Sequence, residues 1–345
     1  MTEKQHIAII GAGMAGIACA RTLVQAGHRV TVFEKNEEVG GRMATLSTPY
    51  GSFDSATQYF TVRDQRFAQA LQTVPGLCRP WSANTVRVLD ERGRVVAANL
   101  PTGEPHWVPN PKMSELLERW AQPLQDSVRL QTRVSRIERD ALNAQHWQIR
   151  TQGPQDSQQV LSGFHSVLLA LPSGPAQRLL QDCGLANALA KKIDKVQVAP
   201  CWTLMLAFPQ AMQPGMYTLG PQWNAARSTH HRIAWLARES SKPGRTSIER
   251  WTVQASAAWS QEHLDDDPAR VQAKLLKAFS EITGIRAQPT QAGVIRWRYA
   301  QTTQALGQTH LWDGKQRIGV CGDWCIGRRV EDAFISGLEL ALSMK

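Results

Sequence analysis

The chain has 345 residues, of which 42% are hydrophobic and 20% are charged. This composition excludes a disordered chain, and the length predicts two domains. The net charge is +10, but the Lys and Arg residues are dispersed and form no long basic run. We therefore expect a solvated basic surface or a pocket for a phosphate-bearing small molecule, and no nucleic-acid partner.

The start of the chain has no signal-peptide pattern, and no apolar run approaches the roughly 18 residues needed to cross a bilayer. We therefore expect a cytoplasmic protein with no membrane partner. The six Cys residues are scattered, which favours free thiols over a disulfide framework. Cys321 and Cys325 lack the two-residue gap that is typical of zinc knuckles, so we expect no metal site.

The first forty residues predict a strand–turn–helix–strand unit. HIAIIG (6–11) is a short apolar run that suits a buried parallel strand. A helix with small and apolar residues follows, and Gly27 stands where it should stop. The second strand, RVTVFEK (29–35), ends in Glu34. This order is typical of a dinucleotide-binding βαβ unit.

Three glycines in GAGMAG have the G-x-G-x-x-G spacing. Gly11 allows the tight turn, Gly13 lets the backbone approach a pyrophosphate, and Gly16 permits close packing of helix on strand. Glu34 follows Gly11 at the distance expected for an acid that binds a ribose diol. The predicted cofactor contacts here are Gly11, Ala12, Gly13, Met14, Ala15, Gly16, Glu34 and Lys35.

The fingerprint alone does not separate NAD from FAD, but VGGRMAT (39–45) follows it. Together these residues resemble the FAD-binding signature shared by amine oxidases and related flavoproteins. The resemblance implies that Gly40, Gly41, Arg42 and Met43 approach FAD from its other side, with Arg42 near the pyrophosphate. The alternative for these residues is a loop with a solvated Arg.

The rest of the chain alternates short strands with amphipathic helices. A helix is predicted from Met113 to about Ala121, and another over 268–284 that ends at Gly284. Strands are predicted within TVRVLD (85–90), RVVAANL (94–100), VRLQTRVSRIERD (128–140) with HWQIRT (146–151) as its hairpin partner, the buried start of SVLLALPSGPAQRLL (166–180), and the region 195–260.

This layout predicts an α/β fold with a discontinuous Rossmann-type FAD-binding domain. A smaller α+β substrate domain with a mainly antiparallel sheet completes it. We expect the FAD-binding domain to comprise residues 1–62, 112–172 and 292–345, and the substrate domain to comprise residues 63–111 and 173–291.

The late segment CGDWCIGRRVEDAFISG (321–337) combines a strand end, a Gly-Asp pair and an amphipathic stretch. The flavoprotein resemblance implies that Asp323 meets the ribityl–phosphate region of FAD. It also implies that the helix starting near Val330 points its N-terminus at the flavin ring, and that the strand of Val134 meets adenine. The further contacts predicted are Gln58, Tyr59, Gly322 and Arg329.

Several segments resemble a narrower group, the bacterial renalase-type flavoproteins, over nearly the whole chain. The most specific are QYFT (58–61), PCW (200–202) and SSKPGR (240–245). Two positions depart from that group's pattern. Glu239 stands where Asn is usual, and Arg328 stands where Gly is usual.

The narrower resemblance implies an oxidase that takes hydride from the 2- or 6-dihydro isomers of NAD(P)H to N5 of non-covalently bound FAD. Dioxygen then reoxidises the flavin and yields hydrogen peroxide, so a dinucleotide and dioxygen are the expected partners. No side chain is predicted to be catalytic, and His230 and His231 are interpreted as surface or phosphate-edge residues. The predicted substrate-binding residues are Tyr59, Phe60, Thr61, Val62, Arg63, Trp107, Val108, Trp202 and Thr203.

Two alternatives share the cofactor domain. One is an amine oxidase, in which a different set of side chains surrounds the substrate. The other is a flavin-binding redox protein without turnover, because an intact fingerprint does not prove catalysis.

Overall fold

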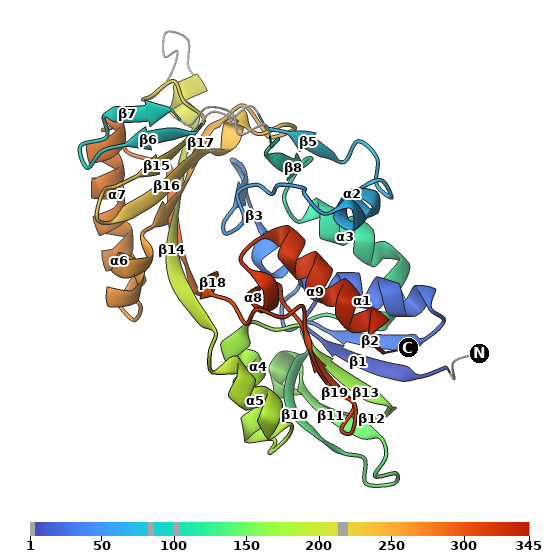
Figure 1. Ribbon diagram of the computed structural model, residues 1–345. Helices are drawn as coiled ribbons and strands as arrows, with labels where there is room; N and C mark the ends of the chain where they lie inside the picture. Colours follow the sequence, from blue (N-terminus) through green and yellow to red (C-terminus); the bar gives the residue numbers. More distant parts are fainter. Residues whose placement is uncertain (1–3, 82–85, 99–103, 213–219, 345) are drawn as a thin grey trace.

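The structure is a computed structural model that describes residues 4–81, 86–98, 104–212 and 220–344. Two large sheets dominate it, and Figure 1 shows them at opposite ends of the molecule. All six Cys residues are free thiols, as predicted. Among the described residues, no helix is both long and apolar enough to span a bilayer.

The first large sheet carries the N-terminal unit and is parallel except at one edge. Its strands in spatial order are β19 (Leu311–Asp313), β20 (Ile318–Val320), β13 (Ser166–Leu169), β1 (His6–Ile10), β2 (Arg29–Phe33) and β9 (Val128–Arg129). Only β19 runs antiparallel to its neighbour. The β-branched residues of β1 and β2 are buried, as a sheet covered on both faces requires.

Helices share cores with both faces of this sheet, α1 (Met14–Gln25) on one face and α4 (Ser173–Asp182) and α5 (Asn187–Ile193) on the other. The other helices of this unit are α2 (Gln65–Leu71), α3 (Glu115–Ala121), α8 (Asp323–Ile326) and α9 (Val330–Leu342). Helix α9 crosses α1 closely, because a Cβ on Gly337 would lie 2.0 Å from the Ala15 carbonyl oxygen. The predicted N-terminal unit is therefore confirmed, and α1 ends just before Gly27, which has a φ of +88°.

A three-stranded antiparallel sheet flanks the first sheet. It consists of β10 (Arg133–Arg139), β11 (Trp147–Gln152) and β12 (Gln158–Phe164). Strands β10 and β11 form the hairpin that the alternating sequence predicted.

The second large sheet has seven strands and is mainly antiparallel. In spatial order they are β18 (Gln291–Gln304), β14 (Gln197–Phe208), β17 (Glu249–Ala255), β16 (Ile233–Arg238), β15 (Ala225–Ser228), β6 (Arg87–Leu89) and β7 (Val95–Ala98). The outer residues of the predicted strands, 85 and 99–100, lie outside the described residues.

Two helices cover one face of this sheet, α6 (Ala257–Glu262) and α7 (Pro268–Thr283), as Figure 1 shows. Asp267 caps α7 by accepting hydrogen bonds from Ala269 and Arg270, and Gly284 ends it in the left-handed conformation. The predicted helix over 268–284 is thus confirmed.

Shorter elements connect the two large sheets. The hairpins are β3 (Thr45–Thr48) with β4 (Gly51–Asp54) and β5 (Cys78–Pro80) with β8 (Trp107–Pro109). The described residues also form five 3₁₀ turns: η1 (Gly41–Met43), η2 (Gln122–Ser127), η3 (Pro154–Asp156), η4 (Pro209–Met212) and η5 (Glu239–Ser241).

The packing corrects three of the expected domain boundaries. Strand β18 reaches Gln304 within the seven-stranded sheet, because it pairs with β14 along nearly its full length. Helices α4 and α5 share a core with the six-stranded sheet instead of the second one. Helix α2 also packs on the first unit, with the Phe67 ring 5.1 Å from that of Phe334. The limits at residues 63, 173 and 292 are therefore wrong.

Candidate functional site

The glycine fingerprint admits no side chain at two of its positions, Gly11 in the turn after β1 and Gly16 in the first turns of α1. Gly11 has a φ of +105°, and a Cβ there would lie 2.5 Å from the Ala170 carbonyl oxygen. A Cβ on Gly16 would lie 1.9 Å from the Gly11 carbonyl oxygen. Both glycines therefore have the steric roles that their spacing predicted.

The N-terminus of α1 is bare backbone. Gly13 is its N-cap residue, and no side chain caps the first turn. Gly41 faces it, since a Cβ on Gly41 would lie 3.3 Å from the Gly13 Cα. Two facing glycines at the positive end of a helix fit the pyrophosphate of a dinucleotide such as FAD.

Glu34 lies at the end of β2 and is buried. One carboxylate oxygen accepts a hydrogen bond from the Ala12 amide at 2.9 Å, and the other accepts one from the Asn36 amide at 3.0 Å. The Thr132 amide donates to the Glu34 carbonyl at 2.8 Å, so the strand of Val134 begins beside it. The structure thus brings together two positions predicted for the adenosine half of the cofactor, while Lys35 is exposed.

Arg42 and Asp323 are 281 positions apart and form an ion pair. Arg42 Nη1 lies 3.0 Å from Asp323 Oδ2 and 3.2 Å from the Ala300 carbonyl oxygen. Thr302 Oγ1 donates to the same Asp323 oxygen at 3.3 Å. Both residues were predicted to contact the cofactor, and here the GGR turn meets the Gly-Asp turn.

The N-terminus of α9 is held to the segment that follows QYFT. Glu331 Oε1 accepts hydrogen bonds from the Arg63 amide at 2.7 Å and from the Asp64 amide at 2.6 Å. Arg329 is the N-cap of α9, and its amide donates to the Asp332 carboxylate at 2.8 Å. The predicted residues Arg329 and Val330 therefore stand at the first turn of a thirteen-residue helix.

Tyr59 lies among aromatic rings from both units. Its ring stacks on that of His106 at 3.9 Å and lies 5.8 Å from that of Trp235. Phe60 and Trp107 exchange two backbone hydrogen bonds of 3.0 and 2.8 Å. The predicted segments 58–63 and 107–108 are therefore neighbours.

Three predicted substrate-binding residues are corrected, because their side chains are packed inside hydrophobic cores. Phe60 packs on Phe67, and Val108 lies in the same core. Trp202 lies under α6 and α7, and its indole N–H donates to the His263 carbonyl at 2.9 Å. Thr203 is also buried, but it projects from the opposite face of β14, toward the first unit, and stays a prediction. Thr61, Val62 and Arg63 stay predictions as well.

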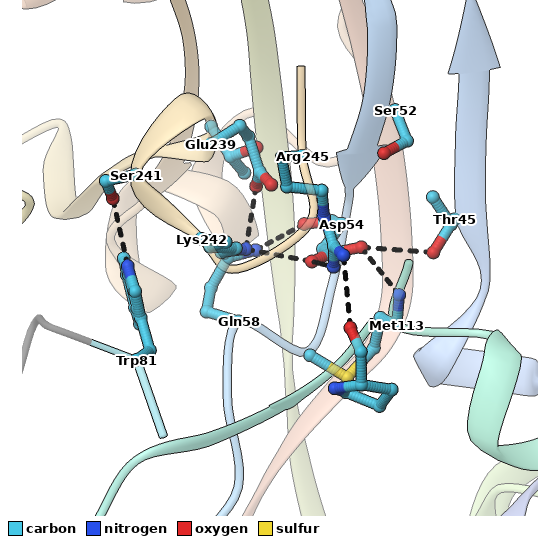
Figure 2. A network of polar contacts seen from close by, with 12 residues as sticks. Thr45, Ser52, Asp54, Gln58, Trp81, Met113, Glu239, Ser241, Lys242 and Arg245 are labelled. Atoms are coloured by element: carbon cyan, nitrogen blue, oxygen red, sulfur yellow. Dashed lines mark hydrogen bonds and ion pairs between the residues drawn. The ribbon is translucent and has the colours of Figure 1, made fainter. Parts of the chain in front are cut away.

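A buried ion network, which the sequence analysis missed, joins the two units beside this site (Figure 2). Lys242 Nζ lies 3.0 Å from Asp54 Oδ2, 2.9 Å from Glu239 Oε1 and 3.3 Å from Gln58 Oε1. The side chains of Lys242 and of both acids are 0% exposed. The SSKPGR segment carries part of the resemblance, but no local pattern in it indicates that its Lys is buried.

Asp54 is the centre of this network. Arg245 Nη2 donates to Asp54 Oδ2 at 2.8 Å, and the Met113 amide donates to Asp54 Oδ1 at 3.1 Å. Burial alone would raise the pKa of Asp54, but the charges and hydrogen bonds of Lys242 and Arg245 outweigh it and lower the pKa to about 2. Asp54 is therefore ionised at neutral pH.

Glu239 has a different environment in the same network. Burial raises its pKa, while Lys242 opposes the shift. Glu239 Oε1 accepts from Thr252 at 2.7 Å, and Oε2 has no partner among the described residues. Glu239 stands where the narrower resemblance has Asn, and it therefore adds a second buried acid next to the Lys242 ammonium.

The network acts as a structural clamp on the predicted cofactor and substrate segments. It ties the segment from Asp54 to Gln58, which precedes Tyr59, to the η5 turn of the second unit. Gln58 was predicted to contact the cofactor, but its amide group is engaged with Lys242 and with the Asp54 carbonyl.

Comparison with known proteins agrees with this geometry. Residues 9–73 match an NAD(P)-binding Rossmann-like domain, and residues 86–342 match the flavin-containing amine oxidoreductases. The chain belongs to the flavin-containing amine oxidoreductase family. Membership implies a flavin cofactor, and the two facing glycines with the Arg42–Asp323 pair are residues that could hold it.

Individual relatives in this family differ in their substrates. A stretch of 58 residues is 47% identical to 4,4'-diapophytoene desaturase of Staphylococcus haemolyticus, covering 17% of this chain and 12% of that protein. Another stretch of 44 residues is 56% identical to L-amino acid oxidase Cdc18 of Crotalus durissus cumanensis, covering 13% and 9%. The chain therefore matches only a small part of these relatives.

Likeness of fold extends over the whole chain. A protein from Exiguobacterium sp. 255-15, proposed to be a protoporphyrinogen oxidase, superposes with a TM-score of 0.75 at 13% identity. The match covers 100% of this chain and 99% of that one. At this identity the likeness establishes the fold and leaves the substrate open.

Proposed function

We propose that this flavin-dependent oxidoreductase oxidises the 2- or 6-dihydro isomers of NAD(P)H to NAD(P)+, with non-covalently bound FAD as the hydride acceptor and dioxygen as the final oxidant. One dihydro isomer, one dioxygen and one proton give one NAD(P)+ and one hydrogen peroxide. The two partners of the protein are therefore a dinucleotide and dioxygen.

The supporting observation is that two of the most specific segments of the narrower resemblance, and the residue that follows the third, meet in space. QYFT and SSKPGR are joined by the bonds of Lys242 to Gln58 and Asp54. Thr203, next to PCW, pairs with Gln254, whose side chain donates to the Ala56 carbonyl at 2.6 Å. Residues 184 to 198 positions apart therefore meet in the segment that precedes Tyr59.

The polar groups of this region suit a reaction that needs positioning more than acid–base chemistry. Oxidation of a dihydropyridine restores aromaticity, so the substrate is already a good hydride donor and needs no protein base. Asp54 is tied to Lys242 and Arg245, and Glu239 is tied to Lys242 and Thr252. Their task in this proposal is to fix Tyr59 and its neighbours, against which the substrate is oriented.

The test is a stoichiometric turnover assay in air with purified FAD-loaded protein. We expect each dihydro isomer consumed to give one NAD(P)+ and one hydrogen peroxide, and ordinary NADH and a panel of amines to give neither. Turnover of an amine in place of the isomers would overturn the proposal in favour of the second candidate.

That second candidate is an amine oxidase, and the family match over residues 86–342 favours it. An amine substrate would release its imine and hydrogen peroxide in the same assay. A protein that keeps its FAD but turns over neither class would instead be a flavin-binding redox protein.

A further inference from the structure

The face of the seven-stranded sheet that is turned away from α6 and α7 carries a straight row of side chains. Strand register places Thr203 opposite Gln254, Gln254 opposite Trp235, and Trp235 opposite Arg227. Residues directly opposite each other project from the same face of a sheet. Their sequence neighbours Leu204 and Leu236 project from the other face into the core under the helices. The row therefore faces the first unit, where Tyr59 lies.

Trp235 supplies a buried donor with no acceptor. It is 9% exposed, and its indole Nε1 has no hydrogen-bond partner among the described residues. Two other buried tryptophans are satisfied: Trp81 donates to Ser241 at 2.9 Å, and Trp324 donates to the Leu171 carbonyl at 2.9 Å. The half-buried Trp297 also has an unpaired Nε1 among the described residues. A buried unpaired N–H costs free energy, so its retention beside Tyr59 points to an acceptor that arrives with a ligand.

Arg227 supplies a cation at the next position of the row. Its side chain is exposed, and it makes no ion pair or hydrogen bond with the rest of the described chain. One strand spacing, about 4.8 Å, separates it from Trp235. The row therefore passes from a buried neutral donor to an exposed, unneutralised guanidinium.

We propose that Trp235 and Arg227 hold the dinucleotide substrate, the indole N–H donating to its carboxamide oxygen and the guanidinium binding a phosphate. The inference rests on the proposed function and identifies the residues that select its substrate class. A ligand with a neutral amide end and an anionic phosphate end matches the order of the row. A cationic amine would be repelled by Arg227, so the row favours a nucleotide over an amine.

The test uses the FAD-loaded protein and two matched variants, Arg227→Gln and Arg92→Gln. Arg92 is an exposed Arg in the β6–β7 turn, beside Gly93, which abuts the end of α7 at Ile282. Calorimetric titration with NAD+ and with nicotinamide riboside, which has no phosphate, needs no turnover. We expect Arg227→Gln to weaken NAD+ binding about tenfold or more and to leave riboside binding unchanged, and Arg92→Gln to change neither.

Trp235→Phe tests the donor separately. Removing an N–H that has no partner takes no hydrogen bond from the fold, so the melting temperature should stay within about 2 °C of the parent value. Binding of both NAD+ and the riboside should weaken about five- to tenfold, because both carry the carboxamide. A purely packing residue would not give weaker binding at unchanged stability.

These outcomes separate the inference from the proposed function. If the dihydro isomers are not oxidised but NAD+ binds in an Arg227-dependent manner, the proposed function fails and the inferred site stands. Equal NAD+ affinity in the parent and in Arg227→Gln, or no NAD+ binding at all, would overturn the inference even if the isomers are oxidised.

Discussion

Replacing Lys242 by Met tests the buried ion network as a stabilising clamp. Met has nearly the length of Lys but no charge, so Asp54 and Glu239 would lose their shared ammonium, which lies within 3.0 Å of each. Removing one partner of a buried ion pair costs about 3–5 kcal/mol. Here Asp54 keeps Arg245, and Glu239, with its raised pKa, can take up a proton. We therefore expect the lower end, about 3 kcal/mol of the free energy of unfolding.

The assay is urea unfolding at pH 7 followed by circular dichroism, with Lys277→Met as the control. Lys277 lies in α7 and has one acidic neighbour, Glu281, but its side chain is 72% exposed. Lys277→Met should change the free energy of unfolding by less than about 0.5 kcal/mol. Adding Glu239→Gln to Lys242→Met should recover about 1 kcal/mol or more, because the two residues are in direct contact. A loss below about 1 kcal/mol for Lys242→Met would refute the clamp.

Two further predictions concern the first unit and pH. Gly16→Ala puts a Cβ 1.9 Å from a carbonyl oxygen of the preceding turn, so it should destabilise the protein by about 1–3 kcal/mol and release FAD, whereas Gly293→Ala, which meets nothing within 4 Å, should do neither. Thermal melts and the flavin absorbance retained after gel filtration measure both effects. The pKa of Asp54 is lowered from 3.8 to about 2. Its contribution to the free energy of unfolding is therefore present above about pH 4 and is lost as the pH falls toward 2. Unfolding titrations from pH 5 to pH 2 should show a loss of about 2 kcal/mol that is absent from Asp54→Asn.

Local patterns made the N-terminal unit predictable. The strand β1, the helix α1 and the glycine turn depend on contacts between near neighbours, so their spacing alone specified the geometry that Gly11 and Gly16 require. The same holds for α7, whose cap residues flank an amphipathic run.

The sequence was less informative about which face of a strand or helix packs against which unit, and about contacts between distant residues. Strand β14 is apolar on both faces, so the sequence could not tell that Trp202 points under the helices while Thr203 points to the first unit. Helix α4 is amphipathic, but its pattern does not say which sheet it covers. The order of elements along the sequence was therefore not enough to place the domain boundaries.

The ion network also depends on contacts between residues that are far apart in the sequence, and no local pattern predicts it. Lys242 and Asp54 are 188 positions apart, and charged residues in turns are usually exposed. Only the tertiary structure brings the two charges together and removes them from water. A Lys in a Ser-Ser-Lys-Pro-Gly turn carries no local sign that it is buried.

Hydride transfer from a dihydro isomer to the flavin is tested most directly by anaerobic mixing of the FAD-loaded protein with one equivalent of the purified isomer, following flavin absorbance. We predict rapid and complete bleaching by the 2- or 6-dihydro isomer, no comparable bleaching by ordinary NADH or amines, and return of the colour in air. Bleaching by an amine alone, with the isomers inert, would contradict it.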